Sequence, residues 1–322
     1  MFPNLFLNLR ASLSAVRLLP ALCFAVAAAP AFAAPKVVAT ITPVQSLAAM
    51  VMEGAGFPQL LLGGGETPHS YSLRPSQSRM LSNADIVIRV GDGLEGFLKK
   101  SLRSLAAGAQ IIELDHLPGM RTYPNRPKGG TGDDGHGHDH GHDHDHNRGT
   151  DPHLWLDTGN AAVIVEAIAS ALSAADPENT PVYTGNAARA SIRLRALKME
   201  IESIVAPVRE RPYFVFHDAW QYFEKEFGLR GGGAIAVSPE RKPGARRLVE
   251  IRAMIRSTGA RCVFAEPQFP PALVKTVIRG TPAKLASLDP LGTGLTRGPG
   301  LYPALMRNLA KSIFSCLNGT YR

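Results

Sequence analysis

The chain has 322 residues, of which 45% are hydrophobic and 19% are charged. This composition excludes an intrinsically disordered chain and fits a folded protein of about two domains. The formal net charge is +8, but the basic residues are scattered or interleaved with acidic ones, as in Arg195, Lys198, Glu200 and Glu202. Such interleaving is typical of a solvated helix face, so we expect no nucleic-acid partner.

Residues 1–33 have the pattern of a secretory signal peptide. Arg10 and Arg17 precede an apolar run over residues 18–29, and an A-x-A cleavage motif follows at 31–33. The run is shorter than the ~20 residues of a membrane-spanning helix, and we expect no later segment to span a membrane. The pattern predicts export to the periplasm and cleavage near Ala33.

Short apolar runs alternate with longer helical patterns, which predicts βα units and largely parallel sheets. Each half of the chain contains four candidate strands. They cover residues 36–41, 59–62, 85–90 and 110–114, then 213–216, 233–237, 262–265 and 284–288. The sequence therefore predicts an α/β fold of two lobes, each with a four-stranded, mainly parallel sheet and surrounding helices.

A long helical pattern lies between the two sets of strands. It opens at Thr180-Pro181 and ends near Pro207, with apolar residues at helical spacing from Leu194 to Val208. A helix of this size spans roughly 40 Å, enough to brace both lobes. We expect a signal peptide at 1–33, an N-terminal lobe at 34–178, a connecting helix at 179–208 and a C-terminal lobe at 209–322.

Residues 127–150, within the N-terminal lobe, are mostly Gly, Asp and His, so we expect a disordered loop. Six histidines occupy alternate positions there: His136, His138, His140, His142, His144 and His146. Imidazole binds borderline transition metals, and alternation with Gly or Asp in a flexible chain indicates a low-affinity secondary site for zinc or nickel. The alternatives are a purification tag and a solvating linker.

Three further histidines lie near predicted strand ends or loops. His69 follows the second strand, His153 follows the histidine-rich segment, and His217 follows the strand at 213–216. In open α/β sheets ligands bind beyond the carboxyl ends of the strands, so a cleft between the lobes is where the three would meet. The spacing alone has no local metal signature, and a surface or capping role stays open for each.

Two cysteines, Cys262 and Cys316, remain once the signal peptide is removed with Cys23. An even number in an oxidising compartment favours a disulfide over two buried thiols. We expect this disulfide to tie the strand at 262–265 to the last helix.

Five stretches of this chain resemble the zinc-specific periplasmic solute-binding proteins of the ZnuA type. They are GETPHSYSLRPS at 65–76, DPHLWLD at 151–157, FHDAWQYF at 216–223, FAEPQF at 264–269 and LDPLG at 288–292. They occur in the family's order, and the resemblance extends over nearly the whole mature chain. A histidine-rich loop before Asp151 is also typical of the zinc members.

The resemblance implies two lobes joined by a rigid helix, with the metal in the cleft and His69, His153 and His217 as ligands. Asp289 occupies the position of a carboxylate ligand in manganese and iron relatives; here it is a fourth ligand, a hydrogen-bond acceptor behind a ligand, or a structural carboxylate. Some zinc members carry Glu directly before the first histidine, where this chain has Pro68, and Glu66 is a weak substitute. The implied partners are an inner-membrane ABC permease and its cytoplasmic ATPase, with the chain itself a monomer.

Three neutral imidazoles with one water or carboxylate form a tetrahedral site suited to Zn²⁺, here the transported ligand. Manganese prefers an oxygen-rich set, and its relatives have Glu where this chain has His217. The alternatives are a manganese or iron carrier, a periplasmic zinc buffer without a permease, and a zinc hydrolase with Glu266 or Asp289 as base. No catalytic motif supports the hydrolase, so we expect the chain not to be an enzyme.

Overall fold

The computed structural model describes residues 34–63, 65–126, 149–236 and 243–320. The first half of the described chain forms four short strands, three of them built on Val or Ile: β1 (Val37–Ala39), β2 (Gln59–Leu60), β3 (Ile86–Arg89) and β4 (Gln110–Glu113). They make one sheet in the order β2-β1-β3-β4, and every neighbouring pair is parallel. We call this sheet and its helices α1 (Thr42–Met52), α2 (Pro75–Ser82), α3 (Asp92–Glu95) and α4 (Leu98–Leu105) the N-terminal lobe.

The C-terminal lobe repeats this arrangement. Its strands are β5 (Tyr213–His217), β6 (Gly231–Ala236), β7 (Cys262–Ala265) and β8 (Lys284–Ser287), in the order β6-β5-β7-β8 and again all parallel. Helices α7 (Gln221–Phe227), α8 (Ala245–Thr258), α9 (Ala272–Ile278) and α10 (Leu301–Leu317) belong to this half of the chain. The predicted two-sheet α/β fold is confirmed, with strand ends at most two residues from their expected positions.

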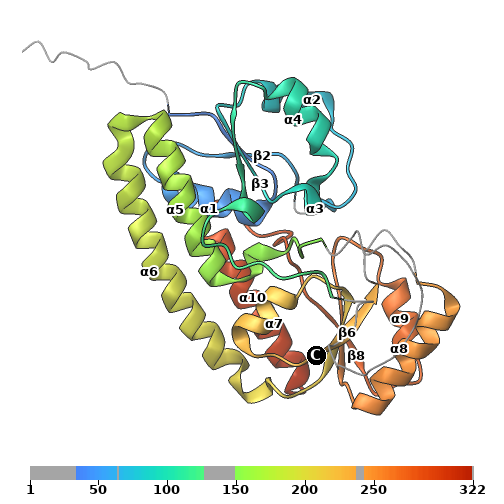
Figure 1. The fold of residues 1–322 in the computed structure, drawn as a ribbon. Helices are drawn as coiled ribbons and strands as arrows, with labels where there is room; N and C mark the ends of the chain where they lie inside the picture. Colours follow the sequence, from blue (N-terminus) through green and yellow to red (C-terminus); the bar gives the residue numbers. More distant parts are fainter. Residues whose placement is uncertain (1–33, 64, 127–148, 237–242, 321–322) are drawn as a thin grey trace, which may run out of the picture. The chain divides into compact units, whose positions relative to one another are not determined.

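Helix α6 (Thr180–Val205) is the predicted connecting helix and has 26 residues. Pro181 stands in its first turn, and a 3₁₀ turn at Ala206–Val208 containing Pro207 follows its end. At 1.5 Å per residue the helix is about 40 Å long. It packs against α1 of the N-terminal lobe and against α10, and Figure 1 shows it running along the outer side of both lobes. Because one continuous helix contacts both halves, it stiffens the connection between them.

Helix α5 (Thr158–Ala175) is the one described helix long and apolar enough to cross a membrane by length and composition, a candidate that the sequence prediction did not foresee. Half of it is buried, and it packs against α1 and α6, as the core helix of a globular fold does. Glu226 of α7 accepts hydrogen bonds from the Thr158 backbone nitrogen at 2.7 Å and hydroxyl at 2.6 Å. The start of α5 is therefore fixed to the C-terminal lobe.

Cys262 of β7 and Cys316 of α10 are joined by a disulfide, which lies where the sequence analysis expected it. Both residues are buried, and both belong to a core cluster that continues through α1, α5, α6 and α10. The bond therefore fastens an inner strand of the second sheet to the helix that packs against α6.

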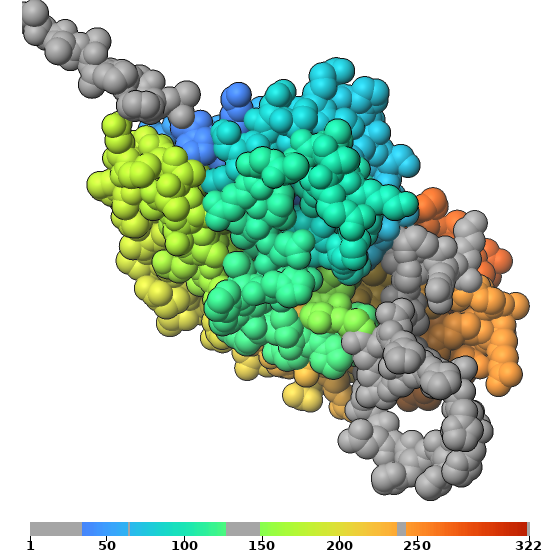
Figure 2. Space-filling view, turned by 45° about the horizontal axis from the view of Figure 1, so that its top comes forward, coloured from blue at the N-terminus to red at the C-terminus, as the bar shows by residue number. Residues whose placement is uncertain are grey.

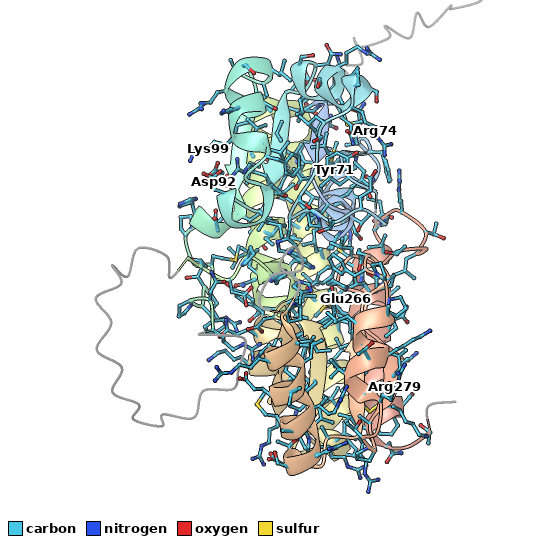
Figure 3. The ribbon with its side chains drawn as sticks, turned by 90° about the vertical axis from the view of Figure 1, so that its right-hand side faces the viewer. Tyr71, Arg74, Asp92, Lys99, Glu266 and Arg279 are labelled. Atoms are coloured by element: carbon cyan, nitrogen blue, oxygen red, sulfur yellow. A yellow bond between two sulfur atoms is a disulfide. The ribbon has the colours of Figure 1, made fainter. Side chains whose placement is uncertain are left out.

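Polar residues stand at the carboxyl ends of strands in both sheets. Thr40 directly follows β1, His217 is the last residue of β5, and Glu266 directly follows β7. In Figure 3 Glu266 lies between the part of the chain that carries Tyr71 and the part that carries Arg279. The carboxyl ends of the strands thus converge on one region, where ligands of open α/β sheets bind.

Candidate metal centre

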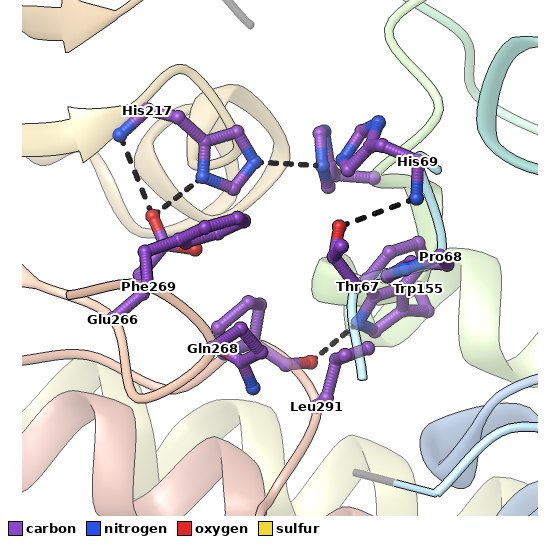
Figure 4. A pocket seen from close by; sticks show the side chains of 11 residues that line it. Thr67, Pro68, His69, Trp155, His217, Glu266, Gln268, Phe269 and Leu291 are labelled. Carbon is purple, nitrogen blue, oxygen red and sulfur yellow. Dashed lines mark hydrogen bonds and ion pairs between the residues drawn. The ribbon is translucent and has the colours of Figure 1, made fainter. Parts of the chain in front are cut away.

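His69, His153 and His217 come together at this region. Each offers a ring nitrogen, and the three nitrogens lie within 4.8 Å of one another. The Nε2 atoms of His153 and His217 are 3.3 Å apart, and the ring of His69 lies 5.3 and 5.5 Å from the other two, centroid to centroid. Figure 4 shows the labelled rings of His69 and His217 among the side chains that line this pocket. These are the three histidines that the sequence analysis selected.

Each histidine is carried by a different part of the fold. His69 stands in the segment between β2 and α2, and His153 directly precedes the 3₁₀ turn Leu154–Leu156. His217 is the last residue of β5, because this strand continues one residue further than the predicted range 213–216. Like His153, it is buried. Because the three positions are separated by more than 60 residues, only the tertiary fold creates the cluster.

His217 is oriented by a buried carboxylate. Its Nδ1 atom lies 2.5 Å from Oε1 of Glu266, which sits at the end of the neighbouring strand β7. Burial by itself would lower the pKa of His217, but the Glu266 charge and hydrogen bond outweigh it, so the pKa is raised above its ordinary value. With Nδ1 held by Glu266, the Nε2 atom is the one left facing the cluster.

His153 is oriented by a second buried carboxylate, that of Asp151. Its Oδ1 atom accepts a hydrogen bond from the His153 backbone nitrogen at 3.0 Å and lies 2.8 Å from Nδ1. Burial would raise the pKa of Asp151, but the hydrogen bond from His153 lowers it below its ordinary value, so Asp151 is a carboxylate. Carboxylates behind the far nitrogen of metal-binding histidines fix the tautomer and raise ligand basicity.

His69 is partly buried, and its backbone nitrogen donates to the Thr67 hydroxyl at 3.3 Å. Burial of the ring, followed by the neighbouring charges of His153 and His217, lowers its pKa well below the ordinary value. The ring of His69 is therefore neutral near pH 7, the state in which imidazole binds a metal.

Apolar side chains wall the pocket around the three rings. Trp155 and Phe269 line it together with Pro68 and Leu291. Trp155 packs 5.4 Å from the His153 ring and donates its indole N–H to the Pro290 carbonyl at 2.9 Å. Apolar walls reduce access by water and favour a compact ion held by neutral nitrogens over a hydrated one.

Asp289 is not part of the three-histidine cluster. Its carboxylate accepts from the Leu291 backbone nitrogen at 3.0 Å, the Thr293 backbone nitrogen at 2.5 Å and the Gln268 amide at 2.8 Å. These bonds hold the turn after β8, which matches the structural-carboxylate alternative. Glu66 is also outside the cluster. Its carboxylate accepts hydrogen bonds from Arg74 at 2.6 Å and from the Tyr71 hydroxyl at 3.3 Å.

The sequence predicts no role for Asp151, and it offers Glu266 only as the base of the hydrolase alternative. Both stand inside the recognised motifs, and the signal for Asp151 is a carboxylate two residues before a candidate ligand. Glu266 has no such local signal, because 48 residues separate it from His217. The six loop histidines at 136–146 lie outside the described residues.

The family model described as ZnuA, zinc-uptake complex component A periplasmic, matches residues 37–316. The chain belongs to the ZnuA family. A high-affinity zinc uptake system protein ZnuA of Brucella suis is 41% identical over 305 residues, which cover 88% of this chain and 91% of that protein. Nearly the whole length of that relative is therefore matched.

Solved structures support the same fold. A crystal structure of ZnuA has a TM-score of 0.74 and 23% identity, covering 88% of this chain and 99% of its own. A solute-binding protein from Pseudomonas aeruginosa in complex with Ni²⁺ has a TM-score of 0.72 and 20% identity, covering 90% and 98%. Because one fold carries a ZnuA and a nickel-bound protein, the choice of metal has to come from the residues in the pocket.

Proposed function

We propose that this chain captures Zn²⁺ in the periplasm and delivers it to an inner-membrane ABC permease driven by a cytoplasmic ATPase. The observation that carries the proposal is the cluster of His69, His153 and His217, with ring nitrogens within 4.8 Å of one another. Membership of a periplasmic zinc-uptake family supports the same cargo. The permease and ATPase follow from the chain's place in an uptake system.

The ligand set favours zinc over manganese. Three imidazole nitrogens are borderline ligands, whereas Mn²⁺ prefers carboxylate, carbonyl and water oxygens. In this proposal a solvent molecule completes the tetrahedron, because Asp289 is engaged with the backbone of its own turn. Asp151 and Glu266 each place one negative charge behind a ligand, which together balance the charge of one divalent ion.

The proposal extends to the signal peptide, the histidine-rich segment, the oligomeric state and the lobe boundaries. Residues 1–33 are a signal peptide cleaved near Ala33, residues 127–150 collect zinc at low affinity, and the mature protein acts as a monomer. The lobes are bounded at 34–178 and 209–322, with 179–208 between them. The chain is a carrier and not an enzyme, because the two carboxylates nearest the cluster are engaged in holding histidines.

A competition titration tests the cargo and the ligands together. The six loop histidines at 136–146 are replaced by serine so that only the pocket binds tightly, and zinc is titrated against a chromophoric chelator. One tight zinc per chain is expected, with manganese bound far more weakly. Replacing His69, His153 or His217 by Ala is expected to weaken binding severely. Tight binding that survives His217→Ala would overturn the proposed site.

A further inference from the structure

We propose that metal capture begins on a half-site formed by His153 and His217, both fixed by helix α7, and that His69 closes the site in a second step. This inference rests on the proposed function and concerns its order of events. It follows from the unequal support that the structure gives the three ligands.

The two nitrogens of the half-site already have the spacing of two ligands on one ion. With Zn–N distances of ~2.0–2.1 Å and a tetrahedral angle, two ligand nitrogens lie about 3.3–3.4 Å apart. The Nε2 atoms of His153 and His217 are 3.3 Å apart, and their Nδ1 atoms are held by Asp151 and Glu266. The pair therefore needs little rearrangement to accept zinc.

His217 is joined to α7 through the chain itself. It ends β5, the Ala219 backbone nitrogen donates to its carbonyl at 3.0 Å, and α7 begins at Gln221. Helix α7 and His217 therefore move as one rigid unit.

His153 is joined to the same helix by side chains. Gln221 donates to Oδ2 of Asp151 at 3.1 Å, while Oδ1 of Asp151 holds His153. The Tyr222 hydroxyl donates to the Asp151 carbonyl at 2.8 Å. Gln221, Tyr222 and Asp151 are all buried. Gln221 and Tyr222 of α7 therefore hold the carboxylate and the backbone carbonyl of Asp151, the residue that orients His153.

The segment that precedes the histidine-rich stretch strengthens this attachment. Gln221 also donates to the Pro124 carbonyl at 3.0 Å, and Arg126 pairs with Asp218 at 2.7 Å and Glu224 at 2.8 Å. Pro124 forms an antiparallel bridge with Thr150. Figure 2 shows the light-green residues after 149 against the green segment that leads to Arg126. His153 is thereby held to the C-terminal lobe, although its sequence position falls in the predicted N-terminal one.

His69 has a separate and purely local support. Its segment is held by Glu66 with Arg74 and Tyr71, and by Gln77, which donates to the Leu61 carbonyl at 2.6 Å. Among the described residues, no hydrogen bond to a ring nitrogen of His69 is found. All these contacts lie within residues 61–77, so His69 moves with the N-terminal lobe while the other two move with α7.

Stopped-flow zinc binding tests the order, with loop histidines replaced by serine and the fluorescence of Trp155 and Trp220 as the signal. His69→Ala should leave the association rate nearly unchanged and raise the dissociation rate. His153→Ala and His217→Ala should each lower the association rate by about tenfold or more. Equal loss of association rate in all three variants would overturn the order.

A matched pair of buried glutamines gives a second measurement that removes no ligand. Gln221→Met releases Asp151 and should slow association by about tenfold. Gln77→Met loosens the His69 segment and should speed dissociation alone. Equal kinetic effects of the two variants would contradict the half-site. A parent chain that fails to bind zinc tightly would instead refute the proposed function, so the two failures are distinguishable.

Discussion

The Nδ1 atom of His217 and the Oε1 atom of Glu266 lie 2.5 Å apart. Both residues are buried, and they stand at the ends of the neighbouring strands β5 and β7. The contact fixes the ring so that Nε2 faces His69 and His153. It also supplies a negative charge beside a ligand of a divalent cation. Glu266 should therefore contribute to zinc affinity without touching the metal.

Glu266→Gln tests this contribution. The amide keeps an acceptor for Nδ1 but removes the charge, so zinc affinity should fall by about 10–100-fold with little change in stability. Glu250→Gln on α8, where the side chain is largely exposed, is the control and should bind like the parent. Competition titration measures both. Unchanged affinity in the Glu266 variant would mean that the carboxylate is only structural.

Asp289→Asn should separate stability from binding. The amide loses one acceptor for the backbone of the turn after β8, which should lower the free energy of unfolding by about 1–3 kcal/mol. Zinc affinity should change by less than about tenfold, because Asp289 is not a ligand in this account. Urea unfolding and competition titration provide the two readouts. A loss of affinity as large as that of His217→Ala would identify Asp289 as a ligand.

Much of the fold could be predicted because its signals are local. Runs such as Ile86–Arg89 and Tyr213–His217 are short and apolar, and Pro181 with Pro207 marks the ends of α6. The ligands required the family resemblance, since the three histidines share no local motif. The roles of Asp289 and Gln221 could not be predicted, because they depend on backbone and side-chain contacts between distant segments.

Glu95 should make stability depend on pH. Its buried carboxyl accepts from the backbone nitrogens of Val90 and Gly91 and from the Thr40 hydroxyl, and burial raises its pKa to about 7. The folded chain then binds this proton more tightly than the unfolded chain, whose Glu pKa is about 4.3. Stability from this group is therefore greatest at low pH and falls as pH rises from about 4.5 to 7.

Glu95→Gln removes this titration while keeping an acceptor for the two backbone nitrogens. Urea unfolding of the metal-free proteins at pH 5 and pH 8 gives the comparison. The parent should lose about 3 kcal/mol more than the variant between the two pH values. The same pH dependence in both proteins would show that Glu95 does not titrate in this range.

The disulfide should stabilise the C-terminal lobe. Cys262 and Cys316 are 54 residues apart in sequence, and closing a loop of that size contributes about 4 kcal/mol in the chain-entropy model. The double variant Cys262→Ala, Cys316→Ala should unfold at lower urea, and the unreduced parent should contain no free thiol. Two titratable thiols in the unreduced protein would refute the bond.

Anomalous diffraction at the zinc edge from crystals of the zinc-loaded mature chain tests the central claim most directly. The predicted result is one strong peak in the pocket, at ~2.0–2.1 Å from a ring nitrogen of each of His69, His153 and His217, with no carboxylate among the ligands. A peak bonded to Asp289 in place of one histidine, or a principal peak outside this pocket, would contradict the account.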